Sequence, residues 1–248
     1  IRAGIQLLVE DDISFDAFCF MNRSMILQRN IMNFSKKHGA GIECAFRDFV
    51  DPRNPSNNFG WRPFQIAFIL MNLKGIVDPE HDNREVVDLL YFPTGGGKTE
   101  AYLGLMAFVI ANRRLRADEN DEYNRDGGVT AILRYTLRLL TTQQRDRITK
   151  MVLAAELIRQ KEYPKYGKEP ISIGFWVGGT VTPNTFKELE EDPEDPAKTR
   201  KARSKKNSIY KQLLTCPFCG KPLTEENFYI DIPTKSVSIY CSCLLYTS

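Results

Sequence analysis

The residues with the clearest chemical potential are residues 93–100, which read PTGGGKTE. Consecutive glycines can turn their backbone N–H groups toward phosphate oxygens, because no Cβ atom blocks the approach. Lys98 supplies a positive charge for the β and γ phosphates, and Thr99 supplies a hydroxyl for Mg²⁺. We therefore expect ATP and Mg²⁺ as cofactors, with Lys98 and Thr99 as catalytic residues. The predicted cofactor-binding residues of this loop are Thr94, Gly95, Gly96, Gly97, Lys98, Thr99 and Glu100.

The segments on either side of the loop have the secondary structure that a phosphate-binding loop requires. Residues 86–92 are a short apolar run that predicts a strand, and residues 101–111 are an apolar stretch that predicts a helix. A strand, a glycine loop and a helix in that order form a phosphate-binding loop. One position departs from the general pattern, since Phe92 stands where a glycine is usual. The alternative is a glycine-rich turn with a chance Lys-Thr, which does not explain the flanking segments.

A glutamine 33 residues before Lys98 adds a second candidate binding group. Gln65 follows Arg62 and Pro63, and Pro63 suits the first turn of a helix that the apolar residues 64–70 predict. The amide of Gln65 offers one acceptor and two donors, which suits the edge of adenine. We expect Arg62 and Gln65 to contact the nucleotide. Without the phosphate loop downstream, the same residues would be an ordinary start of a helix.

Two further apolar runs predict more strands. Residues 129–135 and residues 170–180 are strand-like, and between them a long helix carries Ile148, Met151 and Val152 on one face. Alternating strands and helices favour an α/β fold in which helices flank a parallel sheet.

Polar side chains follow the second of these strands, at the place where ligands bind in such sheets. Their hydroxyl, guanidinium and amide groups suit a sugar-phosphate backbone and do not read base sequence. The predicted nucleic-acid contacts are Thr136, Arg138, Thr141 and Gln143. On composition alone, a helix cap with solvated polar residues explains the segment better, so this alternative stays open.

Four cysteines cluster near the end of the sequence. Cys216 and Cys219 are separated by two residues on a turn followed by Gly220, and this spacing suits a tetrahedral Zn²⁺ ion. Cys241 lies close to the usual zinc-ribbon distance and is the natural third ligand. Cys243 is the predicted fourth ligand, although its spacing to Cys241 is tighter than usual. Buried or free thiols are the alternative.

The composition indicates an ordinary globular protein. The chain has 248 residues, 42% of them hydrophobic, and a net charge of +3, which is too weak to argue for nucleic acid. No apolar run suits a membrane span and no signal peptide is visible, so we expect a cytoplasmic protein. Isolated Cys19 and Cys44 are expected to be small buried side chains. His38 and His81 have no metal-spaced companion, so we expect surface roles for both.

The sequence divides into three predicted parts. Residues 1–59 form a mainly helical segment with an amphipathic helix over residues 15–34. Residues 60–185 form the nucleotide-binding domain, and residues 186–248 form a charged insertion with a zinc-ribbon-like module. The charged residues 188–206 are expected to be mobile. Because the chain starts without Met and stops after the cysteine cluster, we expect an N-terminal fragment of a longer protein.

Taken together, the motifs resemble those of superfamily 2 helicases and translocases. Residues 92–104 are similar to motif I, residues 134–144 to motif Ia, and residues 176–179 to the glycine-pair motif that follows it. Arg62 and Gln65 resemble the upstream glutamine motif. The amino-acid sequences of these motifs are most similar to those of the DrmA helicases of the DISARM bacterial anti-phage systems. The similarity covers about residues 60–243.

The resemblance implies a RecA-like P-loop sheet and an ATP-dependent DNA helicase or translocase, with DNA and other DISARM components as partners. The sequence lacks an Asp-Glu pair at the end of a strand, because Asp121 and Glu122 lie in a polar loop, and it lacks a second RecA-like domain. We therefore expect the longer protein to hydrolyse ATP and this fragment to be inactive alone. Residues 244–248 also resemble translated adapter sequence, which leaves the assignment of Cys243 open.

Two other classes of protein remain open. A P-loop NTPase of another mechanism would use the phosphate loop, and residues 134–144 would then be structural. A zinc-ribbon interaction module would keep only a vestigial nucleotide site. An Asp-Glu pair further along the longer protein, followed by a second domain with an arginine motif, would favour the helicase.

Overall fold

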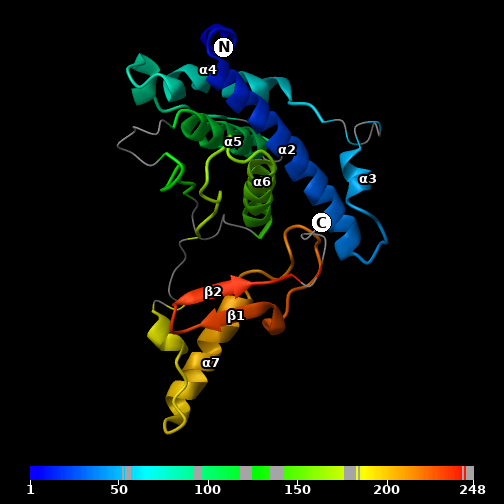
Figure 1. The fold of residues 1–248 in the computed structure, drawn as a ribbon, viewed down its shortest axis with the longest axis vertical. Helices are drawn as coiled ribbons and strands as arrows, with labels where there is room; N and C mark the ends of the chain where they lie inside the picture. Colours follow the sequence, from blue (N-terminus) through cyan, green and yellow to red (C-terminus); the bar gives the residue numbers. More distant parts are fainter. Residues whose placement is uncertain are drawn as a thin grey trace. The chain divides into compact units, whose positions relative to one another are not determined.

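The chain folds into two compact units (Figure 1). The computed structural model describes residues 1–51, 53, 57, 59–91, 96–117, 125–134, 142–175, 183, 185–241 and 243. The first unit consists of Ile1–Met32 and Phe46–Ile173, and the second unit consists of Asn33–Ala45 and Gly174–Ser248. The long helix α2, Asp12–Gly39, belongs to the first unit up to Met32 and to the second unit beyond it.

The first unit is built from helices packed around one apolar core. They are α1 (Arg2–Glu10), most of α2, α3 (Arg47–Val50), α4 (Pro63–Val77), η2 (Asp82–Glu85), α5 (Lys98–Leu115) and α6 (Thr142–Lys161). Phe20, Leu73, Phe108 and Met151 are fully buried in this core. The helices predicted from apolar patterns at the positions of α2, α4, α5 and α6 are confirmed. No helix in the described part of the chain combines the length and apolarity that crossing a membrane requires.

Local chemistry determines where α4 and α5 begin. Pro63 is the first residue of α4, where its missing N–H group is not needed. The residue before it, Arg62, donates its backbone N–H to Oε1 of Gln65 at 2.8 Å. Helix α5 begins at Lys98, directly after Gly97, which has a φ of 87°. Since this left-handed conformation favours glycine, the entry into α5 depends on a glycine at position 97.

A buried arginine fixes loops to the core of the first unit. Arg114 of α5 is 7% exposed. Its guanidinium donates to the backbone carbonyls of Asp126 at 2.9 Å, Tyr166 at 3.0 Å and Glu169 at 2.6 Å. These carbonyls lie outside regular secondary structure, so Arg114 supplies hydrogen bonds that a helix or sheet would otherwise provide.

The described residues do not show the predicted parallel sheet. The parts of the three apolar runs that are described, residues 86–91, 129–134 and 170–175, belong to no helix or strand and form no ladder. Apolar side chains in the first two runs are largely exposed, including Val87 at 93% and Ile132 at 84%, whereas Ile171 of the third run is buried in the core. A strand gains stability only beside a hydrogen-bonded neighbour, and none is present for these runs among the described residues. The apolar pattern alone was therefore not enough to form strands.

The second unit contains the sheet that the described residues do form. Its elements after the end of α2 are η3 (Phe186–Leu189), α7 (Pro196–Tyr210), η4 (Glu225–Asn227), β1 (Phe228–Asp231) and β2 (Ser236–Ile239). Strands β1 and β2 are antiparallel, with Phe228 opposite Ile239. The ring of Phe228 packs against Tyr210 of α7, with ring centres 5.3 Å apart. The hairpin and α7 therefore share a small apolar core.

The segment predicted to be a mobile charged insertion instead contains α7. Asp195 caps the N-terminus of this helix with its side chain. Arg203 and Lys206 pair with Glu191 at 3.2 and 2.9 Å. The acidic residues are followed by basic ones, which led us to expect a mobile segment. Ion pairs between α7 and the residues before it explain this order.

Candidate functional site

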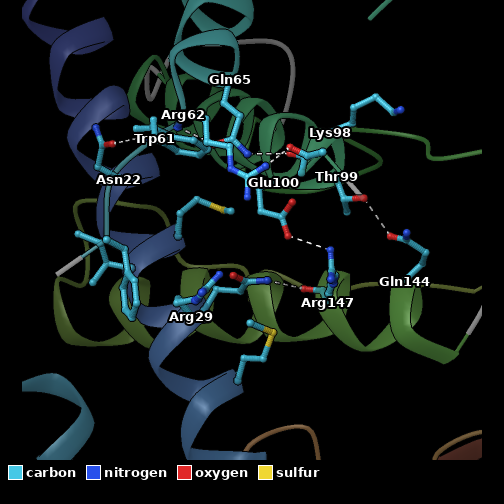
Figure 2. A pocket seen from close by; sticks show the side chains of 18 of the residues that line it. Asn22, Arg29, Trp61, Arg62, Gln65, Lys98, Thr99, Glu100, Gln144 and Arg147 are labelled. Atoms are coloured by element: carbon cyan, nitrogen blue, oxygen red, sulfur yellow. Dashed lines mark hydrogen bonds and ion pairs between the residues drawn. The ribbon is translucent and has the colours of Figure 1, made fainter. Parts of the chain in front are cut away.

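A pocket of about 660 Å³ lies in the first unit at the N-terminus of α5 (Figure 2). Its lining comes from α2, from the residues at the start of α4 and from the first turns of α5 and α6. Residues 96–99, the end of the predicted phosphate loop, line it. Thr94 and Gly95 lie outside the described residues. The volume is in the range of small-molecule sites, which are usually about 300–1,000 Å³.

The predicted pair Arg62 and Gln65 contacts the end of the glycine loop directly. Gln65 is 5% exposed, and its Nε2 donates to the carbonyl of Gly97 at 2.7 Å. The Arg62 guanidinium donates to the carbonyl of Gly96 at 2.8 Å. The C=O and N–H of a trans peptide point in opposite directions, so the N–H groups of Gly97 and Lys98 point away from these two side chains. Arg62 and Gln65 thus orient the loop, a role that the sequence did not reveal.

Two contacts connect the start of α5 to α6 (Figure 2). The hydroxyl of Thr99 donates to Oε1 of Gln144 at 3.2 Å. Glu100 pairs with Arg147 at 2.9 Å, and its other oxygen, Oε2, is buried without a hydrogen-bond partner among the described residues. Glu100 is also the one carboxylate among the residues described as lining the pocket. Gln144 and Arg147 were not predicted as site residues, although Gln144 falls within the motif at residues 134–144.

Three of the predicted metal ligands come together in the second unit. The sulfur atoms of Cys216, Cys219 and Cys241 all lie within 4.8 Å of one another. Those of Cys219 and Cys241 are 3.5 Å apart, which is too far for a disulfide bond of about 2.05 Å. A tetrahedral zinc ion with Zn–S bonds of about 2.3 Å holds its sulfurs about 3.8 Å apart, so the three thiols fit such an ion.

Backbone hydrogen bonds shape the turn that carries the first two cysteines. The N–H of Cys216 donates to the carbonyl of Lys221, and the N–H of Gly220 donates to the carbonyl of Cys216, both at 2.9 Å. Cys243 is not one of the three grouped thiols. Its backbone N–H instead donates to the sulfur of Cys241 at 3.3 Å, a contact that orients a ligand sulfur. The thiol of Cys243 as fourth ligand stays a prediction.

Burial determines the chemistry of these thiols. Cys216 is 3% exposed and Cys219 is fully buried. Burial raises the pKa of the Cys219 thiol, and the neighbouring Cys216 raises it further. Burial also raises the pKa of the Cys241 thiol. Without a cation both thiols are therefore protonated at neutral pH, and binding of a metal would release their protons.

The last turns of α2 support this thiol turn within the second unit. The Nδ1 atom of His38 lies 2.8 Å from the carbonyl oxygen of Cys219, at hydrogen-bond distance. The rings of Phe34 and Phe218 meet edge to face, with centres 5.6 Å apart. A Cβ atom at Gly220 would collide with the α2 backbone. His38 is half-buried, and its contact with the Cys219 carbonyl joins residues 181 positions apart, which the expected surface role did not include.

The sequence has a curated relative that covers nearly all of it. A DISARM protein DrmA from Bacillus paralicheniformis is 45% identical over 249 residues, a match that includes 98% of this chain. The chain is related to DrmA. It spans 21% of the length of that relative. No family model matches the sequence. The resemblance to DrmA that the motifs indicated is thereby confirmed.

The predicted nucleic-acid contacts lie mostly outside the described residues. Thr136, Arg138 and Thr141 fall there, as do residues 176–179. Gln143 is exposed and lines the same pocket as residues 96–99. The structure thus places the one described member of this set at the pocket beside the start of α5.

The isolated cysteines and the second histidine have roles outside both sites. Cys19 and Cys44 are half-buried, not fully buried as predicted. Cys19 lies on nearly the opposite face of α2 from the buried Met21, since residues two positions apart in a helix diverge. His81 accepts a hydrogen bond from the N–H of Asn83 at 3.2 Å and caps η2.

Proposed function

We propose that this chain is the ATP-binding part of a DNA helicase or translocase that acts in a DISARM-type anti-phage defence system. One observation carries the proposal: the glycine loop ends at the N-terminus of α5, held by Arg62 and Gln65, on a pocket of about 660 Å³. Similarity to DrmA supports the defence role and other DISARM components as partners. A cytoplasmic location belongs to the same proposal.

Each side chain has its own task in this proposal. The loop N–H groups and Lys98 hold the β and γ phosphates, and the hydroxyl of Thr99 binds Mg²⁺. Bound ATP supplies the phosphoanhydride whose cleavage drives movement along DNA. Gln65 keeps one acceptor position and one N–H beyond the two hydrogen bonds it makes, and these can meet the edge of adenine.

We also propose that residues 86–91, 129–134 and 171–175 are strands of a RecA-like parallel sheet in the longer protein. Exposed apolar side chains in the first two segments are unsuited to solvent, and central parallel strands are normally covered on both faces. The relative is about five times as long as the matched stretch, so further chain exists to pair with and cover these strands.

The same proposal includes the predicted nucleic-acid contacts and the predicted zinc ligands. Thr136, Arg138, Thr141 and Gln143 would contact the DNA backbone without reading sequence. Because Gln143 precedes Gln144, which accepts from Thr99, the start of α6 offers a route by which the nucleotide and DNA contacts influence each other. Cys216, Cys219 and Cys241, with Cys243 as fourth ligand, would hold a structural Zn²⁺.

The test compares the 248-residue chain with the longer gene product. The chain should bind ATP but hydrolyse it negligibly, because Glu100, its one described pocket carboxylate, is engaged with Arg147. The longer protein should show ATP hydrolysis that DNA stimulates. Lys98→Ala should lower this rate by roughly 100-fold or more.

Lys36→Ala is the matched control, since it removes a positive charge from an exposed position outside the pocket lining. Equal ATPase rates for Lys98→Ala and the wild type would contradict the assignment. ATP hydrolysis that DNA does not stimulate would favour a P-loop NTPase of another class.

A further inference from the structure

The nucleotide pocket has a wall on α2, a helix to which the sequence assigned no chemistry. Most of the α2 residues at this wall follow one another at spacings of three or four positions, which places them on one face of the helix. They are Asn22, Met25, Ile26, Gln28, Arg29 and Met32.

This wall is connected to both sides of the pocket (Figure 2). The indole N–H of Trp61 donates to Oδ1 of Asn22 at 2.7 Å. The side-chain amide of Gln28 donates to the backbone carbonyl of Arg147 at 3.3 Å. Helix α2 is thus joined to the segment that precedes α4 and to α6, so its lining residues are positioned before any ligand arrives.

The α2 wall differs in chemistry from the phosphate end of the pocket. The guanidinium carbon of Arg29 lies 5.0 Å from the centre of the Phe59 ring, an arrangement typical of a cation–π contact. Among the described residues no ion pair involves Arg29. A planar guanidinium and an aromatic ring both stack on nucleobases, and the thioethers of Met25 and Met32 adapt to flat apolar surfaces. A polar loop at one end and this wall at another match the two chemically different ends of a nucleotide.

We propose that this face of α2, together with Phe59, is the base-binding wall of the pocket, and that Arg29 stacks on the purine ring of ATP. The inference rests on the proposed nucleotide-binding function. It separates two contributions to base binding. Gln65, whose amide already bonds Arg62 and Gly97, meets the edge of the ring, whereas Arg29, held against Phe59, contacts one of its faces.

The experiment measures binding of two probes, Mg²⁺-ATP and Mg²⁺-tripolyphosphate, to the 248-residue chain by calorimetry. Tripolyphosphate has the phosphates but no base. Arg29→Ala should weaken ATP binding by roughly threefold to tenfold, the range of a stacked cation, and leave tripolyphosphate binding unchanged. Phe59→Ala should do the same. Arg29→Lys keeps the charge but loses the planar group, so it should recover only part of the ATP affinity.

Two controls separate this inference from the function on which it rests. Lys98→Ala should weaken both probes, and Lys36→Ala should weaken neither. Unchanged ATP affinity in Arg29→Ala, or an equal loss for ATP and tripolyphosphate, would overturn the base-binding role while the nucleotide site stands. A wild-type chain that binds neither probe would overturn the nucleotide site itself, and this inference with it.

Discussion

The pocket at the start of α5 in the first unit and the thiol cluster of the second unit are stabilised in different ways. In the pocket, polar side chains have hydrogen-bond or ion-pair partners within the protein. Gln65 donates to the carbonyl of Gly97, and Glu100 pairs with Arg147. In the thiol cluster, buried sulfurs face one another, and hydrogen bonds with weak thiol donors are the contacts described between them. In our proposal, packing forms the pocket before a ligand binds, whereas a cation completes the thiol cluster.

The largest effect on this comparison should come from removing two of the thiols proposed to bind the metal. Replacing Cys216 and Cys219 together with serine should reduce bound zinc from about one ion per chain to none. The second unit should then lose its protection against hydrogen exchange, because structural zinc contributes about 10–16 kcal/mol of apparent binding energy in small domains. ATP binding in the first unit should persist. Metal analysis, hydrogen exchange and ATP titration measure the three quantities.

The control for this experiment is the double replacement of Cys19 and Cys44 with serine, since neither belongs to the thiol cluster. It should leave the zinc content unchanged. If the Cys216 and Cys219 variant kept its zinc, the metal site would be wrong. If it lost ATP binding together with zinc, the two units would not be independent and the comparison would fail.

A smaller effect, on stability, should follow from removing the buried guanidinium of Arg114 in the first unit. Arg114→Met keeps an apolar side chain of similar length but leaves the carbonyls of Asp126, Tyr166 and Glu169 without their donor. Leaving buried polar groups unsatisfied should lower the free energy of unfolding by about 1–3 kcal/mol. Urea denaturation measures this change. Arg200→Met, at an exposed position on α7, should change stability by less than about 0.5 kcal/mol, and an equal effect of both variants would contradict the role of Arg114.

The smallest expected effect is a pH dependence in the first unit. Burial alone would raise the pKa of Glu156, but hydrogen bonds from Arg159 at 2.7 Å and from the N–H of Ile171 at 2.8 Å outweigh it and lower the pKa. A carboxyl with a lower pKa in the folded state adds stability above its unfolded pKa of about 4.3. This stability is lost as the pH falls through the folded value.

Unfolding free energies measured between pH 3 and pH 7 test this prediction. The wild-type chain should lose stability below about pH 4, and Glu156→Gln should lose less over the same interval because glutamine does not titrate. At pH 7 the variant should be less stable, since Arg159 is then buried without its carboxylate. Parallel stability curves for the two chains would show that Glu156 does not contribute to the pH dependence.

Much of the candidate site was predictable because its chemistry is carried by residue type and short spacing. The glycine loop with Lys98 and Thr99, the upstream Gln65 and the pair Cys216 and Cys219 all stand out without a structure. The helices were predictable for a related reason, since an apolar stripe repeats over a few turns of a single segment. The predicted strands were not observed among the described residues, because a strand depends on neighbours that its own sequence does not contain.

Only the tertiary structure decided which of these residues support one another. Gln65 and Gly97 are 32 positions apart, Gln28 and Arg147 are 119 apart, and His38 and the carbonyl of Cys219 are 181 apart. No local pattern records such pairs, since they form when packed helices bring distant side chains within hydrogen-bond reach. The sequence by itself therefore determined which groups can do chemistry. The packing of α2, α4, α5 and α6 determined that the pocket at the start of α5 includes α2. It also determined that Gln65, which was expected to contact the nucleotide, holds the end of the glycine loop.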